Sequence, residues 1–142
     1  VTGNMKQDSG TVDAPIGRHP VDRKRMAVDI THGKRAVTHY EVLARYSGYT
    51  YLKCRLETGR THQIRVHAKY LGHPVVGDKS YGYKKQKFEL KGQLLHAYRL
   101  TFAHPSSGEI MTFVAPVPDY FVKVYDTLAA KNGAKRFDSV NI

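Results

Sequence analysis

The chain has 142 residues, of which 41% are hydrophobic, 11% aromatic and 25% charged, so it fits one globular domain and is not wholly disordered. Its formal net charge of +11 favours a polyanionic partner, above all a nucleic acid, over an acidic small molecule. No apolar run reaches the ~20 residues of a membrane span, and the N-terminus has no secretory signal. The single cysteine excludes an internal disulfide and a multi-cysteine zinc site. We therefore expect a cytoplasmic protein without contact to a membrane.

The first predicted elements are a short strand and a basic loop. Residues 11–16 favour a strand that Pro15 weakens or ends. Residues 17–25 favour a loop, because they contain glycine and proline and show no hydrophobic periodicity. Such a loop is either a solvated surface or a contact to nucleic acid, and the net charge of the chain keeps the second interpretation open. Its candidate RNA-contacting residues are Arg18, His19, Arg23, Lys24 and Arg25.

A β-hairpin is predicted next. Residues 36–46 and 49–57 are rich in β-branched and aromatic residues, and Ser47-Gly48 forms a two-residue turn between them. Cys54 lies inside the second strand, which favours a small core residue over a nucleophile. The alternation of that strand places Leu52, Cys54 and Leu56 on one face, and Tyr51, Lys53 and Arg55 on the other.

A helix of about ten residues is predicted after this hairpin, with Thr61 as its N-cap and Gly72 and Pro74 beyond its end. On a helical wheel one side carries Ile64, His67, Ala68 and Leu71. A second side carries His62, Arg65 and Lys69. One side can therefore pack on a sheet, while the other presents positive charge to a phosphate or to a buried carboxylate.

The last third predicts a second hairpin and a second helix. Residues 94–103 and 109–115 are its strands, and residues 104–108 are its turn. Residues 119–131 form an amphipathic helix with Gly133 just past its end, and its apolar face carries Phe121, Val124, Tyr125 and Leu128. The predicted fold class is α+β, with a mainly antiparallel mixed sheet and flanking helices.

The sequence does not favour a metal site or a nucleotide-binding loop. His62 and His67 are five residues apart, which splits them between helix faces and does not suit a metal site. No glycine pattern that cradles phosphates is present. Gly77 and Asp78 are expected to turn or cap the chain, and His96 is expected in a strand as a core or pocket-wall residue.

One stretch of sequence carries a specific resemblance. The longest matching strings lie at residues 56–67 and 72–78 and at Tyr81-Gly82. The most specific of them is Gly59-Arg60-Thr61-His62-Gln63-Ile64-Arg65-Val66-His67. Leu95-His96-Ala97, Phe102-Ala103-His104-Pro105 and Phe113-Val114-Ala115-Pro116 continue it. With the basic loop upstream, the chain resembles the RluA-like family of ribosomal large-subunit pseudouridine synthases over roughly residues 11–128.

The resemblance implies an enzyme, an isomerase that converts uridine to pseudouridine in ribosomal or transfer RNA, without a cofactor or a metal. In this family an aspartate of a His-Arg-Leu-Asp string attacks the nucleoside, and the arginine of the Gln-Ile-Arg string pairs with it; that arginine is Arg65 here. The resemblance places Ile64, His62 and Gln63 at the substrate pocket. It adds Arg60, Lys69 and Lys79 to the RNA-contacting residues of the basic loop.

The sequence departs from the family at the nucleophile, because it contains no His-Arg-Leu-Asp string. Asp22 lies in the basic loop and is not assigned that role. We therefore expect residues 1–142 to be the C-terminal portion of one catalytic domain, inactive alone, with the missing N-terminal part as a partner. Arg65 should then be solvated, bound to an anion or paired with a substitute acid, since an unpaired buried guanidinium is costly. The alternative is a non-catalytic basic RNA-binding module.

Overall fold

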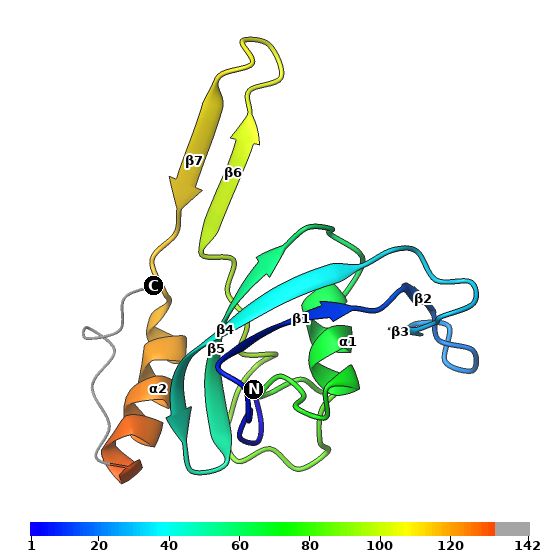
Figure 1. Ribbon diagram of the computed structural model, residues 1–142. Helices are drawn as coiled ribbons and strands as arrows, with labels where there is room; N and C mark the ends of the chain where they lie inside the picture. The colour runs from blue at the N-terminus through cyan, green and yellow to red at the C-terminus, as the bar shows by residue number, and fades with distance from the viewer. Residues whose placement is uncertain (133–142) are drawn as a thin grey trace.

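The computed structural model describes residues 1–132 and shows antiparallel sheets with two helices (Figure 1). A three-stranded sheet has the order β1-β4-β5, formed by Ser9–Asp13, Val37–Tyr46 and Tyr49–Leu56. Strands β2 (Ile16–Arg18) and β3 (Met26–Val28) form one two-stranded sheet, and β6 (Arg99–Ala103) and β7 (Ile110–Val114) form another. The helices are α1 (Gln63–Tyr70) and α2 (Asp119–Asn132). The predicted α+β class is confirmed, with separate small sheets in place of one large sheet. Neither described helix is long and apolar enough to cross a bilayer.

The first hairpin forms as predicted. Tyr46 pairs with Tyr49 across a two-residue turn, and Gly48 has a φ of 79°, which the left-handed turn position requires. The register shifts between Val42 and Ala44, where β4 carries an irregularity. Because strand side chains alternate, Thr50 and Tyr51 point to opposite faces of this sheet, and a helix packs on part of each face.

Helix α2 covers the Tyr51 face at the turn end of the hairpin. The Tyr51 ring lies 5.6 Å from that of Phe121 and 5.2 Å from that of Tyr125. Tyr46 joins the same core, whose buried helix residues are Val124, Tyr125, Leu128 and Ala129. The predicted apolar face of this helix is therefore confirmed. Gly133, predicted just past the helix end, lies outside the described residues.

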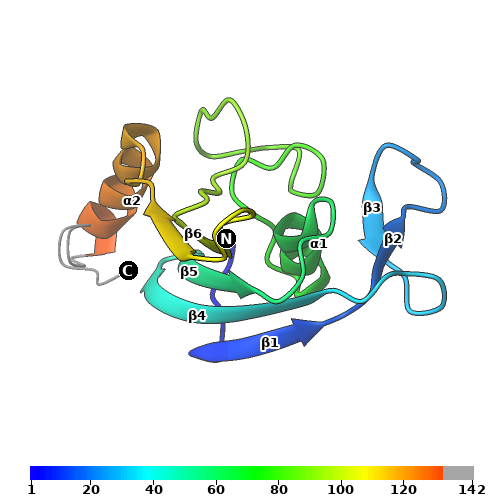
Figure 2. The same ribbon diagram turned by 90° about the horizontal axis from the view of Figure 1, so that it is seen from above.

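Helix α1 lies on the other face of the sheet, where it contacts β4, and it also contacts β3 (Figure 2). It is shorter than predicted: it begins at Gln63, and His62 before it has a left-handed backbone with a φ of 56°. Its end is close to the prediction, since Gly72 takes a positive φ of 81° just after it. The predicted apolar side was partly wrong, because Ile64 is only half-buried and Leu71 is exposed. The buried residues are Gln63, Val66, His67 and Ala68.

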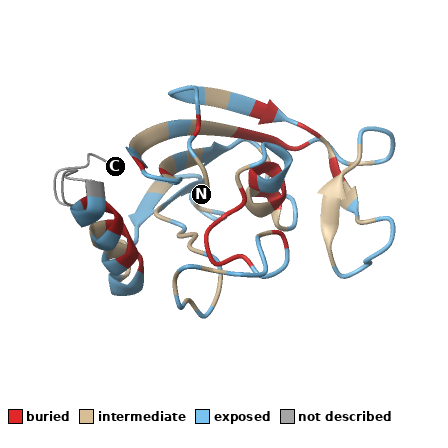
Figure 3. Cartoon of the chain, turned by 90° about the horizontal axis from the view of Figure 1, so that it is seen from below, coloured by how far each residue is buried: buried red, intermediate tan, exposed pale blue. Residues whose placement is uncertain are grey.

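The second hairpin, β6–β7, projects away from both helices (Figure 1). Its strands are shorter than predicted, and His96 lies before β6 in irregular chain, where its Nε2 bonds to the carbonyl oxygen of Ala115 at 3.0 Å. The expectation of a strand at His96 was therefore wrong. Burial colouring separates the buried α1 and α2 faces from this exposed hairpin (Figure 3).

Candidate functional site

The arginine singled out by the sequence is held by a buried carboxylate. Arg65 lies on α1, and its Nε donates to Asp78 Oδ2 at 2.7 Å while its Nη2 donates to Asp78 Oδ1 at 3.0 Å. The Arg65 side chain is 13% exposed and that of Asp78 is 0% exposed. Of the outcomes expected for Arg65, pairing with a substitute acid is the one observed, and the acid is Asp78.

The charges of this pair stabilise each other. Burial alone would raise the pKa of Asp78, but hydrogen bonds from Arg65 and from backbone N–H groups outweigh it, so the pKa is lowered. The hydrogen bonds to Asp78 raise the pKa of Arg65. Both groups are therefore ionised at neutral pH, and the two parallel hydrogen bonds fix the plane of the guanidinium.

Tyr81 connects this pair to the rest of the site. Its ring lies under the Arg65 guanidinium, with 4.9 Å from Cζ to the ring centroid, and the Arg25 guanidinium lies 5.3 Å from the same centroid. Its hydroxyl accepts from the Met26 N–H at 2.9 Å and lies 2.7 Å from His62 Nδ1. Since Tyr81 is 4% exposed, it acts as the buried centre of the cluster.

His62 presents a neutral imidazole to this cluster. Burial lowers its pKa, and the positive charge of Arg65 lowers it further. With the Met26 N–H already donating to the Tyr81 oxygen, the Tyr81 hydroxyl is free to donate to His62 Nδ1. That hydrogen bond would leave the imidazole proton on Nε2.

Gln63, predicted at the substrate pocket, instead joins α1 to the sheet. It is 3% exposed, and its Nε2 donates to the Val37 carbonyl and to Thr38 Oγ1, both at 3.0 Å. Its Oε1 accepts from the Thr58 hydroxyl and from the Arg60 N–H. Because all of these amide contacts lie within the chain, Gln63 shapes the turn before α1 and holds the helix on the sheet.

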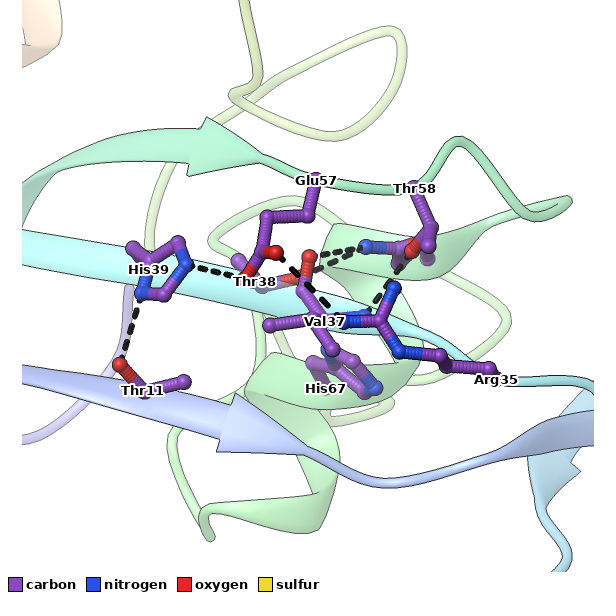
Figure 4. A network of polar contacts seen from close by, with 9 residues as sticks. Thr11, Arg35, Val37, Thr38, His39, Glu57, Thr58 and His67 are labelled. Atoms are coloured by element: carbon purple, nitrogen blue, oxygen red, sulfur yellow. Dashed lines mark hydrogen bonds and ion pairs between the residues drawn. The ribbon is translucent and has the colours of Figure 1, made fainter.

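The same network continues to His67 (Figure 4). His67 is 1% exposed, with Nδ1 2.8 Å from Thr38 Oγ1 and Nε2 2.9 Å from the Ala14 carbonyl oxygen. On the exposed side of the sheet, Glu57 lies between Arg35 and His39. The hydrogen bonds of His67 fix the position of α1 on the sheet, and so the position of Arg65 on that helix.

The basic loop connects β2 to β3 and approaches the cluster through one residue. Arg25 lies over Tyr81, and its Nε is buried without a hydrogen-bond partner among the described residues. Arg18 Nη1 donates to the Arg23 carbonyl, and His19 Nδ1 accepts N–H bonds from the next residues of the loop. The exposed cations around the site are Arg18, Arg23, Lys24, Arg60, Lys69 and Lys79, while Ile64 and His19 are half-buried.

Sequence reasoning missed the roles of Asp78 and Tyr81. Both were within the recognised strings, but nothing in their spacing of thirteen and sixteen residues from Arg65 indicated contact. Cys54 is half-buried, and burial raises the pKa of its thiol to about 11, which does not suit a nucleophile. In residues 1–132, no group of three or more His, Cys, Asp or Glu side chains is arranged to hold a metal ion.

Comparison with known proteins gives consistent matches. The sequence model of the RNA pseudouridylate synthase family matches residues 1–70. The uncharacterised RNA pseudouridine synthase YlyB of Bacillus subtilis is 50% identical over 133 residues, which are 94% of this chain and 43% of that protein. Ribosomal large subunit pseudouridine synthase D of Nitrosomonas europaea is 49% identical, over 84% of this chain and 36% of that protein. The chain thus spans less than half the length of these curated relatives.

Solved structures agree with the sequence matches. The human RNA pseudouridylate synthase domain containing 1 superposes with a TM-score of 0.70 at 29% identity, over 81% of this chain and 51% of that one. The human protein named RNA pseudouridylate synthase domain containing 4 superposes with a TM-score of 0.68 at 23% identity, which supports the fold.

Proposed function

The chain belongs to the RNA pseudouridine synthase family, and we propose that it carries the arginine-bearing part of a uridine site in an enzyme that converts uridine to pseudouridine in RNA. The observation that carries this proposal is the geometry of Arg65. Its guanidinium is held at Nε and Nη2, and no described residue accepts a hydrogen bond from Nη1. That atom is available to a second carboxylate, the role that the family resemblance assigns to this arginine.

The proposed reaction is an isomerisation that needs no cofactor. The bond between N1 of uracil and C1′ of the ribose breaks, the base turns, and a bond forms between C5 and C1′. C5 loses its proton to solvent and N1 gains one, so no oxidant or reductant is consumed. A guanidinium beside the attacking carboxylate would keep it ionised within a base-sized apolar pocket, where burial alone would favour the neutral form.

The nucleophile is proposed to come from a part of the protein other than residues 1–142. No His-Arg-Leu-Asp string occurs in this sequence. The aspartate closest to Arg65, Asp78, is fully buried and already bound on both oxygens. We therefore expect the 142-residue chain to be inactive alone, and its partner in the reaction to be the N-terminal portion of the same catalytic domain.

The proposed substrate is ribosomal RNA, with transfer RNA as the other candidate, in the cytoplasm. Several relatives are named as ribosomal large-subunit enzymes, which supports the first choice. The net charge of +11 supports RNA contact, and a flipped-out uridine suits a site bordered by cations and aromatic rings. The proposed RNA-contacting residues are Arg18, His19, Arg23, Lys24, Arg25, Arg60, Lys69 and Lys79, with Ile64 and His62 at the base.

The test measures tritium released from ribosomal RNA labelled at C5 of uridine, since forming the new bond expels that hydrogen. The full-length protein should release tritium, and its Arg65→Lys variant should do so at least ~100-fold more slowly, because lysine cannot hold two carboxylates in a fixed plane. A full-length protein that releases none from ribosomal or transfer RNA would overturn the proposal.

The second candidate function is a non-catalytic RNA-binding module, which the absent nucleophile string favours for the chain taken alone. The same experiment separates the two functions. If the full-length protein binds RNA tightly and releases no tritium, the binding module is the correct description.

A further inference from the structure

Two turns in this chain share one geometry, at residues 29–33 and 78–82. Each begins with an aspartate whose Oδ1 accepts the backbone N–H groups two and three residues later, at 3.1 and 2.9 Å in the first turn and 3.0 Å each in the second. In each, the glycine four residues later donates its N–H to the aspartate carbonyl, at 2.9 and 3.0 Å. A Cβ on that glycine would clash with the same carbonyl oxygen. The turn itself therefore requires one side-chain oxygen, which an asparagine also supplies.

The two aspartates differ in what else they contact. Asp29 forms no ion pair with any described residue, whereas Asp78 binds Nε and Nη2 of Arg65. The Asp78 side chain has no exposed surface, so it cannot touch a bound RNA without a rearrangement of the turn. A buried charge without a partner would be costly, so the carboxylate at this position is explained by Arg65 and not by the turn.

The contacts of Arg65 fix its direction as well as its charge. The carboxylate engages the Nε edge of the guanidinium side-on, and the Tyr81 ring lies beneath it. This arrangement leaves Nη1 as the group directed away from Asp78. An arginine with five donors and flexible torsions would otherwise reach a second carboxylate in many orientations, most of them unproductive.

We propose that Asp78 is a positioning residue of the uridine site, which acts through Arg65 by holding its guanidinium with Nη1 directed toward the attacking carboxylate. This inference rests on the proposed function. It assigns to Asp78 no contact with RNA and no proton transfer, so its removal should slow the reaction without weakening RNA binding.

The experiment uses the full-length protein and the Asp78→Asn variant. Asparagine retains an oxygen for the turn but loses the second acceptor and the charge that Arg65 needs. We expect kcat to fall ~10- to 100-fold, while KM and the Kd for RNA stay within about twofold. Asp29→Asn is the matched control, because it makes the same change in the same type of turn without an arginine. It should leave kcat unchanged.

A double-mutant comparison separates positioning from a merely structural role. If Asp78 acts through Arg65, the proteins carrying Arg65→Lys alone and Arg65→Lys with Asp78→Asn should have the same kcat. If Asp78 only supports the fold, the second change should lower the rate further, and this result would overturn the inference. An unchanged kcat in Asp78→Asn would overturn it as well.

An NMR measurement keeps this outcome distinct from failure of the proposed function. The Nε–H resonance of Arg65 should be protected from exchange in the unaltered protein and lose that protection in Asp78→Asn, whether or not pseudouridine forms. Protection that persists in the variant contradicts the positioning role. If protection is lost as expected but the unaltered protein forms no pseudouridine, the proposed function fails, and with it the role of Asp78 in catalysis.

Discussion

His67 shows how single polar residues in this chain combine burial with satisfied hydrogen bonding. Its ring is enclosed between α1, β4 and the segment after β1, with one nitrogen 2.8 Å from the Thr38 hydroxyl oxygen and the other 2.9 Å from the Ala14 carbonyl oxygen. Thr38 in turn accepts from Gln63, so the three side chains form one continuous network. Such a network stabilises the chain only while every member keeps its protonation state.

Burial lowers the pKa of His67 below its ordinary value of 6.5, so stability should fall as the pH drops through that value. The unfolded chain then binds a proton that the folded chain excludes, and the free energy of unfolding rises with pH in this range. Urea unfolding at pH 7.5 and 5.5 should show this loss. In His67→Gln, which keeps a donor and an acceptor but does not titrate, the loss should be smaller. An equal loss in both proteins would show that other groups cause it.

At the scale of elements, α2 and the β6–β7 hairpin contrast sharply. Helix α2 buries the apolar face that its period of 3.6 residues predicts, against Tyr46 and Tyr51 of the first hairpin. Strands β6 and β7 have equally apolar sequences, yet Leu100 and Ile110 are 61% and 68% exposed. The Phe102 and Phe113 rings stack across the two strands, with 5.8 Å between their centroids. Apolar content therefore does not decide which element is buried.

Leu128 and Leu100 provide a matched pair of substitutions. Leu128 in α2 is 7% exposed, so Leu128→Ala should lower the free energy of unfolding of the 142-residue chain by ~2–5 kcal/mol through lost burial and a cavity. The same change at Leu100 in β6 should cost less than ~1 kcal/mol, because that side chain already faces solvent. Chemical denaturation followed by circular dichroism measures both. Equal costs at the two positions would show that the hairpin is buried in solution.

At the scale of the whole molecule, part of the net charge of +11 can be assigned to one region of the structure. The loop between β2 and β3 carries exposed Arg23 and Lys24 and follows exposed Arg18 at the end of β2, and Arg25 connects it to Tyr81 and the Arg65 pair. The loop thus lies beside the site whose arginine we assign to catalysis.

Neutralising the loop should reduce the salt dependence of RNA binding. Each lost phosphate contact should lower the slope of log K against log salt by ~0.7 for a single strand, so Arg23→Gln with Lys24→Gln should lower it by about 1 to 1.5. Lys53→Gln with Arg55→Gln makes the same charge change on exposed positions of β5 and should lower it less. Fluorescence anisotropy between 50 and 300 mM salt measures the slopes. Equal slopes for the two double variants would show that the loop is not part of the RNA-binding surface.

Sequence patterns were sufficient to predict the family, the α+β class, the first hairpin and the buried face of α2, because each of these depends on a local period, a turn residue or a specific string. Only the tertiary contacts reveal the partner of Arg65, the hydrogen bond between His62 and Tyr81, the internal role of Gln63 and the exposure of β6–β7. These depend on contacts between residues distant in the chain, since Thr38 and His67 are 29 residues apart and Met26 and Tyr81 are 55 apart. A local pattern fixes which face of an element is apolar or charged. The path of the whole chain decides which residues pack against that face.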